Sequence, residues 1–321
     1  MKLQARLFAL WISIIILPQT VAAADTLIPV GQVIGIELQE DKVIVAAFDD
    51  ALGGAAETAG LRVGDEILSM DGLTVDSAAD VKEALAHSKG LVSLVVLRDG
   101  KEQTIRIAPV ITADGPRLGV YLRQGVTGIG TVTWYDPDSG RFGALGHGVN
   151  NAEGMLVDMT GGSAYDAGVQ SVKRGKVGQP GQLIGTVTEP DPLGVLEENT
   201  CRGIFGTCPA GWAGEAYPVG AAEDVTTGTA VIRSTVTGET PREYSVEILK
   251  IYPGNRNDGR NMLIRVTDPE LLAATGGIVQ GMSGSPIIQN GKLVGAVTHV
   301  LVNSPDTGYG IFIENMLDAA W

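Results

Sequence analysis

Histidine, cysteine and aromatic residues are scarce in this chain of 321 residues. Only three histidines and two cysteines occur. Cys201 and Cys208 make a poor zinc site, because no further Cys and no His lies near them in the sequence. In an exported chain the two could close a disulfide, and two free thiols are the alternative. Aromatic residues make up only 5% while Gly occurs 44 times, which favours tight turns and short strands packed through small aliphatic side chains.

Positive charge is also in short supply. Against 37 Asp and Glu there are 23 Lys and Arg, which gives a formal net charge of −14. Nucleic-acid binding needs a basic face, so we expect no nucleic-acid partner. The mean hydropathy of +0.17 argues against disorder. The length is enough for two domains that each bury a core.

Residues 1–24 are typical of an export signal. Lys2 and Arg6 precede an apolar run at 7–17, and small residues follow at 22–24. The run is short for a membrane span, which needs about 20 residues. A cleaved signal peptide and a retained membrane anchor both stay open, and in either case we expect the rest of the chain to be extracytoplasmic.

Residues 27–110 resemble a PDZ domain of the circularly permuted kind found beside bacterial peptidases. The pattern predicts a helical turn at 55–59, a strand at 66–70, a helix capped by Ser77 that ends at His87, and a closing hairpin. The resemblance implies a groove in which an extended peptide adds a strand. The candidate groove residues are Val33, Ile34, Gly35 and Ile36 in a loop, with Val81 and Leu85 on the helix wall. The alternative is that these side chains are only core.

Residues 117–321 form short β-like runs separated by Gly, Asn, Asp and Pro, which predicts an all-β barrel or sandwich. Within them, residues 281–286 resemble the nucleophile turn of chymotrypsin-like peptidases. Gly281 would let its own N–H and that of Ser283 converge as an oxyanion hole. The strand that follows would bind the substrate backbone through Val297, Thr298 and His299. A tight Gly-Ser loop without catalytic function is the alternative.

A serine nucleophile needs a base, and His147 is the favoured candidate. It lies between Gly146 and Gly148, which leave the imidazole exposed at a strand end. His299 is the alternative base, whereas His87 falls on the surface of the PDZ helix.

Four segments together resemble the stage IV sporulation protein B serine peptidases of endospore-forming Firmicutes: 144–148, 203–206, 275–289 and 291–300. The resemblance implies a chymotrypsin-like double β-barrel after the PDZ domain, with Ser283 as nucleophile, His147 as base and Asp268 as the acid that orients the imidazole. It implies no cofactor. It also implies cleavage of the chain itself and of a membrane-bound regulator of an intramembrane metalloprotease, which activates a late sporulation sigma factor. The place of action would be the space between forespore and mother cell.

The role of Asp268 has a structural alternative. It lies 15 residues before Ser283, whereas chymotrypsin-like enzymes place the acid after the histidine in the first barrel. By that order the candidates are Asp158, Asp166 and Asp191. Asp268 precedes Pro269 and could instead cap a helix.

The sequence therefore predicts an extracytoplasmic serine endopeptidase. Its PDZ ligand could be its own N-terminal segment. The alternative is a non-catalytic PDZ adaptor on an inactive peptidase scaffold.

Overall fold

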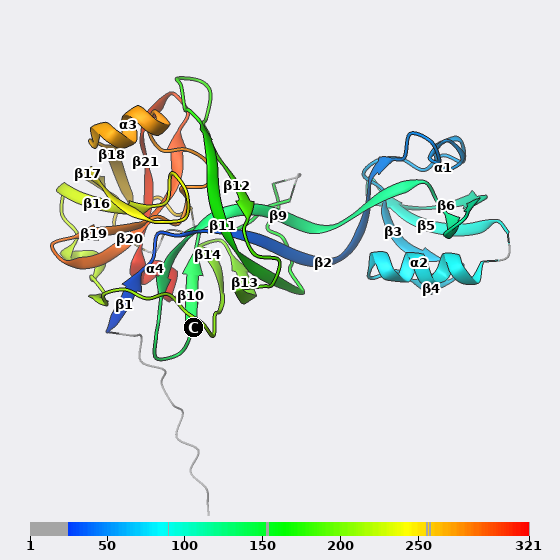
Figure 1. Ribbon diagram of the computed structural model, residues 1–321, viewed down its shortest axis with the longest axis horizontal. Helices are drawn as coiled ribbons and strands as arrows, with labels where there is room; N and C mark the ends of the chain where they lie inside the picture. The colour runs from blue at the N-terminus through cyan, green and yellow to red at the C-terminus, as the bar shows by residue number, and fades with distance from the viewer. Residues whose placement is uncertain (1–24, 89, 152–153, 255, 257, 321) are drawn as a thin grey trace, which may run out of the picture.

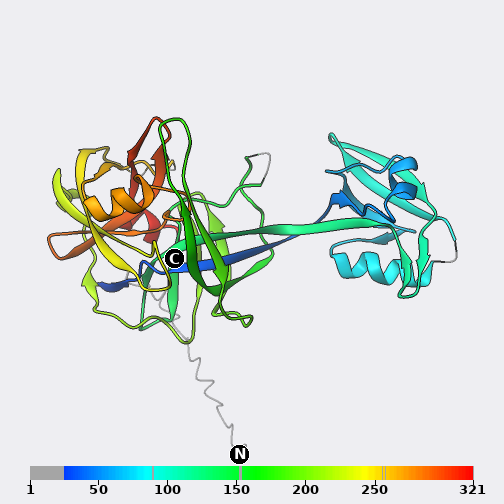
Figure 2. The same ribbon diagram turned by 45° about the horizontal axis from the view of Figure 1, so that its top comes forward.

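The structure is a computed structural model that describes residues 25–88, 90–151, 154–254, 256 and 258–320. Two β-barrels pack into one body, and a smaller module stands apart from them at the end of a long two-stranded ribbon (Figure 1, Figure 2). The expected export signal at 1–24 lies outside the described residues. No helix in the described part of the chain is both long enough and apolar enough to cross a membrane.

Six strands close the first barrel. Their pairing runs from β2 through β9, β10, β14, β13 and β11 back to β2. The bounds are β2 (Val33–Phe48), β9 (Val120–Tyr135), β10 (Arg141–Ala144), β11 (Gly161–Lys173), β13 (Gly194–Thr200) and β14 (Gly203–Thr207). Added to this ring are β1 (Thr26–Pro29), β12 (Gln182–Val187) and β15 (Tyr217–Pro218). The two cysteines of this barrel are free, Cys201 at the surface and Cys208 buried.

The second barrel is also closed by six strands. They are β16 (Gly228–Ser234), β17 (Arg242–Ile251), β18 (Met262–Val266), β19 (Pro286–Gln289), β20 (Lys292–Leu301) and β21 (Ser304–Phe312). Three short helices accompany them, η1 (Ala222–Asp224), α3 (Pro269–Thr275) and α4 (Ile313–Leu317). Burial alternates from residue to residue along β16 and β18, as expected for a strand with one face toward a core. Ile and Val side chains of these strands therefore pack into the barrel core. The expected mainly β fold, with a peptidase barrel domain and a PDZ domain, is confirmed.

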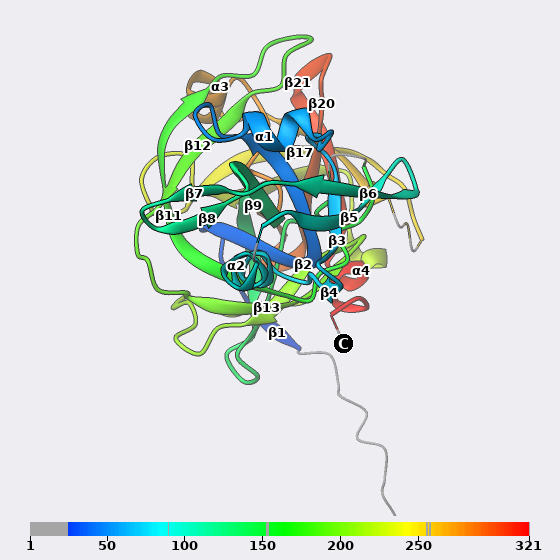
Figure 3. The ribbon, with the colours of Figure 1, turned by 90° about the vertical axis from the view of Figure 1, so that its right-hand side faces the viewer.

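The outlying module has its own hydrophobic core, which includes Val81 and Leu85 of the capped helix. Its elements are α1 (Gly54–Thr58), β3 (Glu66–Met70), β4 (Leu73–Thr74), α2 (Ala78–His87), β5 (Val92–Arg98), β6 (Lys101–Ile107), β7 (Val110–Thr112) and β8 (Gly115–Arg117). The Ser77 hydroxyl accepts a hydrogen bond from Asp80 N–H, so the predicted cap is confirmed. Figure 3, viewed along the long axis, shows this module in front of the barrels.

The boundaries between the domains differ from those expected. Residues 26–38 belong to the first barrel, because β1 and the first half of β2 pair with its strands. The PDZ core begins at Val43 and extends to Leu118, and Val120 and Leu122 pack against it. The PDZ domain is therefore inserted between two strands of a barrel, and β2 and β9 belong to both domains.

Gly125 marks the point where β9 leaves the barrel. Its φ is +84°, and a Cβ there would lie 1.8 Å from the carbonyl oxygen of Leu38 on the paired strand. Only glycine fits this close approach. The register between β2 and β9 shifts at the same place, between Leu38 and Val43, so the ribbon bends as it passes from one domain to the other.

Candidate active site

Ser283 lies in a turn between α3 and β19, at the contact between the two barrels. Gly281 and Gly284 flank it, each with φ +96°. A Cβ on Gly284 would lie 1.9 Å from the carbonyl oxygen of Thr131 in β9. A glycine is therefore required at this position, because the turn approaches the first barrel too closely for a side chain.

The backbone amides of the turn divide into two groups. Those of Gln280, Met282, Gly284 and Ser285 donate to protein carbonyls. Those of Gly281 and Ser283 donate to no acceptor among the described residues. The carbonyls of residues 280–284 all accept hydrogen bonds. Gln280 O accepts from Leu183 N–H, Gly281 O from the Thr131 hydroxyl, and Met282 O from both the N–H and the hydroxyl of Ser285. Ser283 O accepts from Thr131 N–H and Gly284 O from the Thr133 hydroxyl. The two unbound amides are those predicted for an oxyanion hole.

His147 follows a tight turn at the end of β10. Leu145 and Gly146 both have φ +70°, a conformation that is uncommon for leucine. His147 Nδ1 lies 2.9 Å from the carbonyl oxygen of Gly148. A carbonyl only accepts, so Nδ1 carries the proton and Nε2 keeps the lone pair that a general base needs. The backbone of Gly148 thus sets the tautomer that an acid sets in a Ser-His-Asp triad.

The Ser283 hydroxyl donates to the carbonyl oxygen of Thr298, at 2.8 Å. To pass its proton to His147, the hydroxyl must turn away from this carbonyl. Catalytic hydrogen bonds commonly form only when substrate is bound.

His299 lies beside His147, with 5.2 Å between the ring centroids. Burial lowers the pKa of His147 below its usual value of 6.5, although the bond to Gly148 acts in the other direction. Burial first, then the neighbouring His147, lowers the pKa of His299 to about 4. Both rings are therefore neutral near pH 7. His299 Nδ1 is buried with no hydrogen-bond partner among the described residues.

One pocket joins these groups, and its side chains come from both barrels. Among the described residues, none of those that line it is Asp, Glu, Lys or Arg. The lining includes His147, Ser283, Thr298, His299, Val300, Ile278, Val279, Ile129 and Ile36. Of the predicted substrate strand, Thr298 and His299 line the pocket. Val297 does not, because it is fully buried and pairs with Gly284 and Ser285. Sequence reasoning missed Ile278 and Val300, although both lie within three residues of predicted site residues.

Asp268 does not reach this pocket. Its carboxylate accepts from the N–H groups of Glu270 and Leu271, both at 3.0 Å, and caps α3. The structure therefore corrects the expectation that Asp268 contacts His147, and the helix-cap interpretation is confirmed. Asp158, Asp166 and Asp191 do not line the pocket either.

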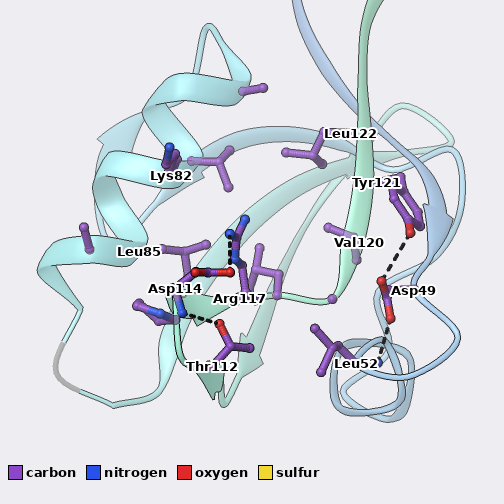
Figure 4. A pocket seen from close by; sticks show the side chains of 16 residues that line it. Asp49, Leu52, Lys82, Leu85, Thr112, Asp114, Arg117, Val120, Tyr121 and Leu122 are labelled. Carbon is purple, nitrogen blue, oxygen red and sulfur yellow. Dashed lines mark hydrogen bonds and ion pairs between the residues drawn. The ribbon is translucent and has the colours of Figure 1, made fainter.

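A second groove lies in the PDZ domain, between α2 and the start of β9 (Figure 4). Val81 and Leu85 line it, as predicted. Its far wall is Val120–Leu122 of β9, with the end of β8 and the connecting residues Leu118 and Gly119. One edge of this β9 segment pairs with β2. The other edge faces α2, and no strand in the described part of the chain pairs with it. An extended peptide could add there.

The prediction that Val33, Ile34, Gly35 and Ile36 form the PDZ loop is wrong. These residues lie in the barrel half of β2, where β11 pairs with one edge and β9 with the other. No edge is left for a ligand. Instead, Leu118 and Gly119 precede the groove strand, and Gly119 O accepts from Asp49 N–H at 2.8 Å. The sequence signal was Arg117-Leu118-Gly119, which lies beyond the boundary we expected for the domain.

The chain matches two family models and is similar to known proteins over part of its length. The family model described as SpoIVB peptidase S55 matches residues 115–317, and a PDZ domain model matches 32–108. Crystal structures of the Rv3671c protease in an inactive form are similar at 17% identity and TM-score 0.35, covering 59% of this chain and 81% of that one. The crystal structure of a serine-to-alanine mutant of Rv3671c from M. tuberculosis H37Rv, also in an inactive form, is similar at 19% identity and TM-score 0.33. The match covers 59% of this chain and 78% of that one.

A putative zinc metalloprotease of Mesorhizobium japonicum, mll0638, is 33% identical over 75 residues, which are 23% of this chain and 20% of that protein. The chain thus spans about a fifth of this relative's length. The family models define the class of this protein, a serine peptidase that carries a PDZ domain. The chain belongs to the SpoIVB peptidase S55 family, whose model covers more than half of it.

Replacing Asp268 separates capping from catalysis. We expect Asp268→Asn to keep its activity within about twofold, because Asn caps a helix as well as Asp does. Asp268→Ala should lower the free energy of unfolding by about 1 kcal/mol. Urea denaturation measures the free energy of unfolding, and the rate of fluorophosphonate labelling measures the activity. A loss near 10⁴-fold in folded Asp268→Asn, as expected for a triad acid, would contradict the assignment.

The pH dependence of catalysis should reflect the buried base. If His147 is the base, its neutral form is the active one. Its pKa lies below 6.5, so activity should rise with pH through an inflection below 6.5 and be level above it. His299, with a pKa of about 4, should add no inflection between pH 5 and 8. The pH profile of kcat/KM, or of the labelling rate, measures this. An inflection at 7 or above would show that His147 is not held neutral by burial.

Proposed function

We propose that this peptidase is an extracytoplasmic serine endopeptidase of sporulation signalling, with Ser283 as nucleophile and His147 as general base. The observation that carries the catalytic assignment is the meeting of three features in one pocket. These are the Ser283 hydroxyl, an imidazole whose Nε2 is free to accept, and two backbone amides without acceptors.

Each group has a defined step in this reaction. Ser283 Oγ attacks the peptide carbonyl while its proton passes to His147 Nε2, and the amides of Gly281 and Ser283 bind the developing oxyanion. The imidazolium then protonates the leaving amine, and water hydrolyses the acyl-enzyme by the reverse path. The uncharged lining of the pocket favours an uncharged, apolar side chain at the scissile bond.

The biological role rests on membership of the SpoIVB peptidase S55 family. We propose that the chain is exported or anchored through residues 1–24. Its substrates are then itself and a membrane-bound regulator of an intramembrane metalloprotease, and this cleavage leads to activation of a late sporulation sigma factor. The open edge of β9 in the PDZ domain would present a peptide segment of the substrate or of the chain's own N-terminal region.

Fluorophosphonate labelling tests the catalytic assignment. The wild-type protein should form an adduct at Ser283, and Ser283→Ala should form none. His147→Ala should slow turnover on the order of 10⁶-fold, because the members of a catalytic unit lose most of the rate together. His87→Ala, on the exposed face of α2, is the matched control and should behave as wild type.

Two results would change the proposal. If no adduct forms on folded wild-type protein, the chain is a non-catalytic PDZ adaptor. If His147→Ala retains turnover and His299→Ala loses it, His299 is the base.

The PDZ groove can be blocked without disturbing the peptidase. Ala86 lies on α2, is exposed and lines the groove, whereas Ala79 is exposed on the same helix but does not line it. We expect Ala86→Glu to weaken binding of peptides with an apolar C-terminal residue by about tenfold or more, because the carboxylate repels the peptide's own. Ala79→Glu should bind as wild type. Fluorescence polarisation with free-acid and amidated peptides measures this, and equal binding by both variants would show that the groove is structural.

A further inference from the structure

Thr131 connects the two halves of the active site, yet it touches no substrate. It is fully buried on β9 of the first barrel. Its hydroxyl donates to Gly281 O at 2.7 Å, and its N–H donates to Ser283 O at 3.1 Å. Its carbonyl accepts from Leu145 N–H at 3.2 Å, two residues before His147. One residue therefore binds both the nucleophile turn and the turn that presents the base.

We propose that Thr131 is a positioning residue for the oxyanion hole, and this inference rests on the proposed function. Its hydroxyl holds the carbonyl of the Gly281–Met282 peptide. This peptide links the two peptides that carry the hole amides of Gly281 and Ser283, so its orientation sets how those amides point relative to each other. Gly281 has no Cβ to restrict its torsions, so the linking peptide is held by its two hydrogen bonds, one from the Thr131 hydroxyl to Gly281 O and one from Met282 N–H to Val279 O.

The partners of the other carbonyls single out Thr131 as the position to test. Gln280 O is held by a main-chain amide of β12, and Met282 O by Ser285 within the turn itself. Only the carbonyls of Gly281 and Gly284 depend on side chains of the first barrel. Of these two, the Gly281 carbonyl lies between the hole amides, whereas the Gly284 carbonyl follows them.

Thr133 supplies a matched control. It is also fully buried on the same face of β9, and its hydroxyl donates to Gly284 O at 2.8 Å. Thr131→Val and Thr133→Val each keep the branched shape, remove one hydroxyl and leave one buried carbonyl without its partner. Their effects on stability should be similar. Thr131→Ser keeps the hydroxyl and tests rescue.

The experiment compares these variants with wild-type protein by three measurements on the full chain. They are the second-order rate of reaction with a fluorophosphonate, the melting temperature, and hydrogen exchange of the segment 278–286. We expect Thr131→Val to react about 10- to 100-fold more slowly, since loss of one hole donor costs on the order of 10²–10³-fold and a misaligned donor costs part of that. The segment should exchange faster. Thr131→Ser and Thr133→Val should stay within about threefold of wild type.

Either of two outcomes would overturn the positioning role. One is a Thr131→Val protein that reacts as fast as wild type. The other is an equal loss of rate in Thr131→Val and Thr133→Val with equal losses of melting temperature, which is what a merely structural hydroxyl would give. If wild-type protein itself fails to react, the proposed function fails, and the positioning role fails with it. A reactive wild type with an unaffected Thr131→Val contradicts the positioning role alone.

Discussion

The carbonyl groups of the nucleophile turn all point away from the pocket into hydrogen bonds, and the rest of the site depends on this constraint. A peptide unit carries its N–H opposite its C=O, so fixing the carbonyls of Gln280 and Met282 also fixes the amides of Gly281 and Ser283. Those two amides are left facing a pocket with nothing to bind in the described chain. A buried amide without a partner is costly, and an oxyanion that forms during the reaction removes that cost.

The strand β9 runs from the PDZ groove to the nucleophile turn. At its start, Val120 and Leu122 form one wall of the PDZ groove. Near its end, the Thr131 hydroxyl donates to Gly281 O of the nucleophile turn. The insertion of the PDZ domain into a barrel hairpin therefore places a peptide-binding edge and the support of the oxyanion hole on one continuous strand. A PDZ domain attached by a flexible linker would have no such shared element.

Sequence reasoning recovered what local patterns determine. The strand at Glu66–Met70 and the capped helix ending at His87 match the structure, because turn residues and alternating side chains define them locally. The Gly-rich settings of Ser283 and His147 also pointed to residues that share one pocket.

What the sequence could not reveal depends on pairing between distant segments. Val33–Ile36 has the composition of a PDZ loop, but long-range pairing with β11 and β9 places it in a barrel. The family resemblance implied that Asp268 is the acid, whereas its carboxylate caps the helix that follows it. Thr131 lies 152 residues before Ser283 (283 − 131), and no spacing or motif connects them.

The account's central claim is that Ser283 attacks with the Gly281 and Ser283 amides as its oxyanion hole. The most direct measurement is a crystal structure of the full chain after reaction with a fluorophosphonate. We predict a covalent bond from Ser283 Oγ to phosphorus, with the phosphonyl oxygen about 2.7–3.1 Å from both amide nitrogens. An adduct on another residue, or a phosphonyl oxygen turned away from these amides, would contradict the account.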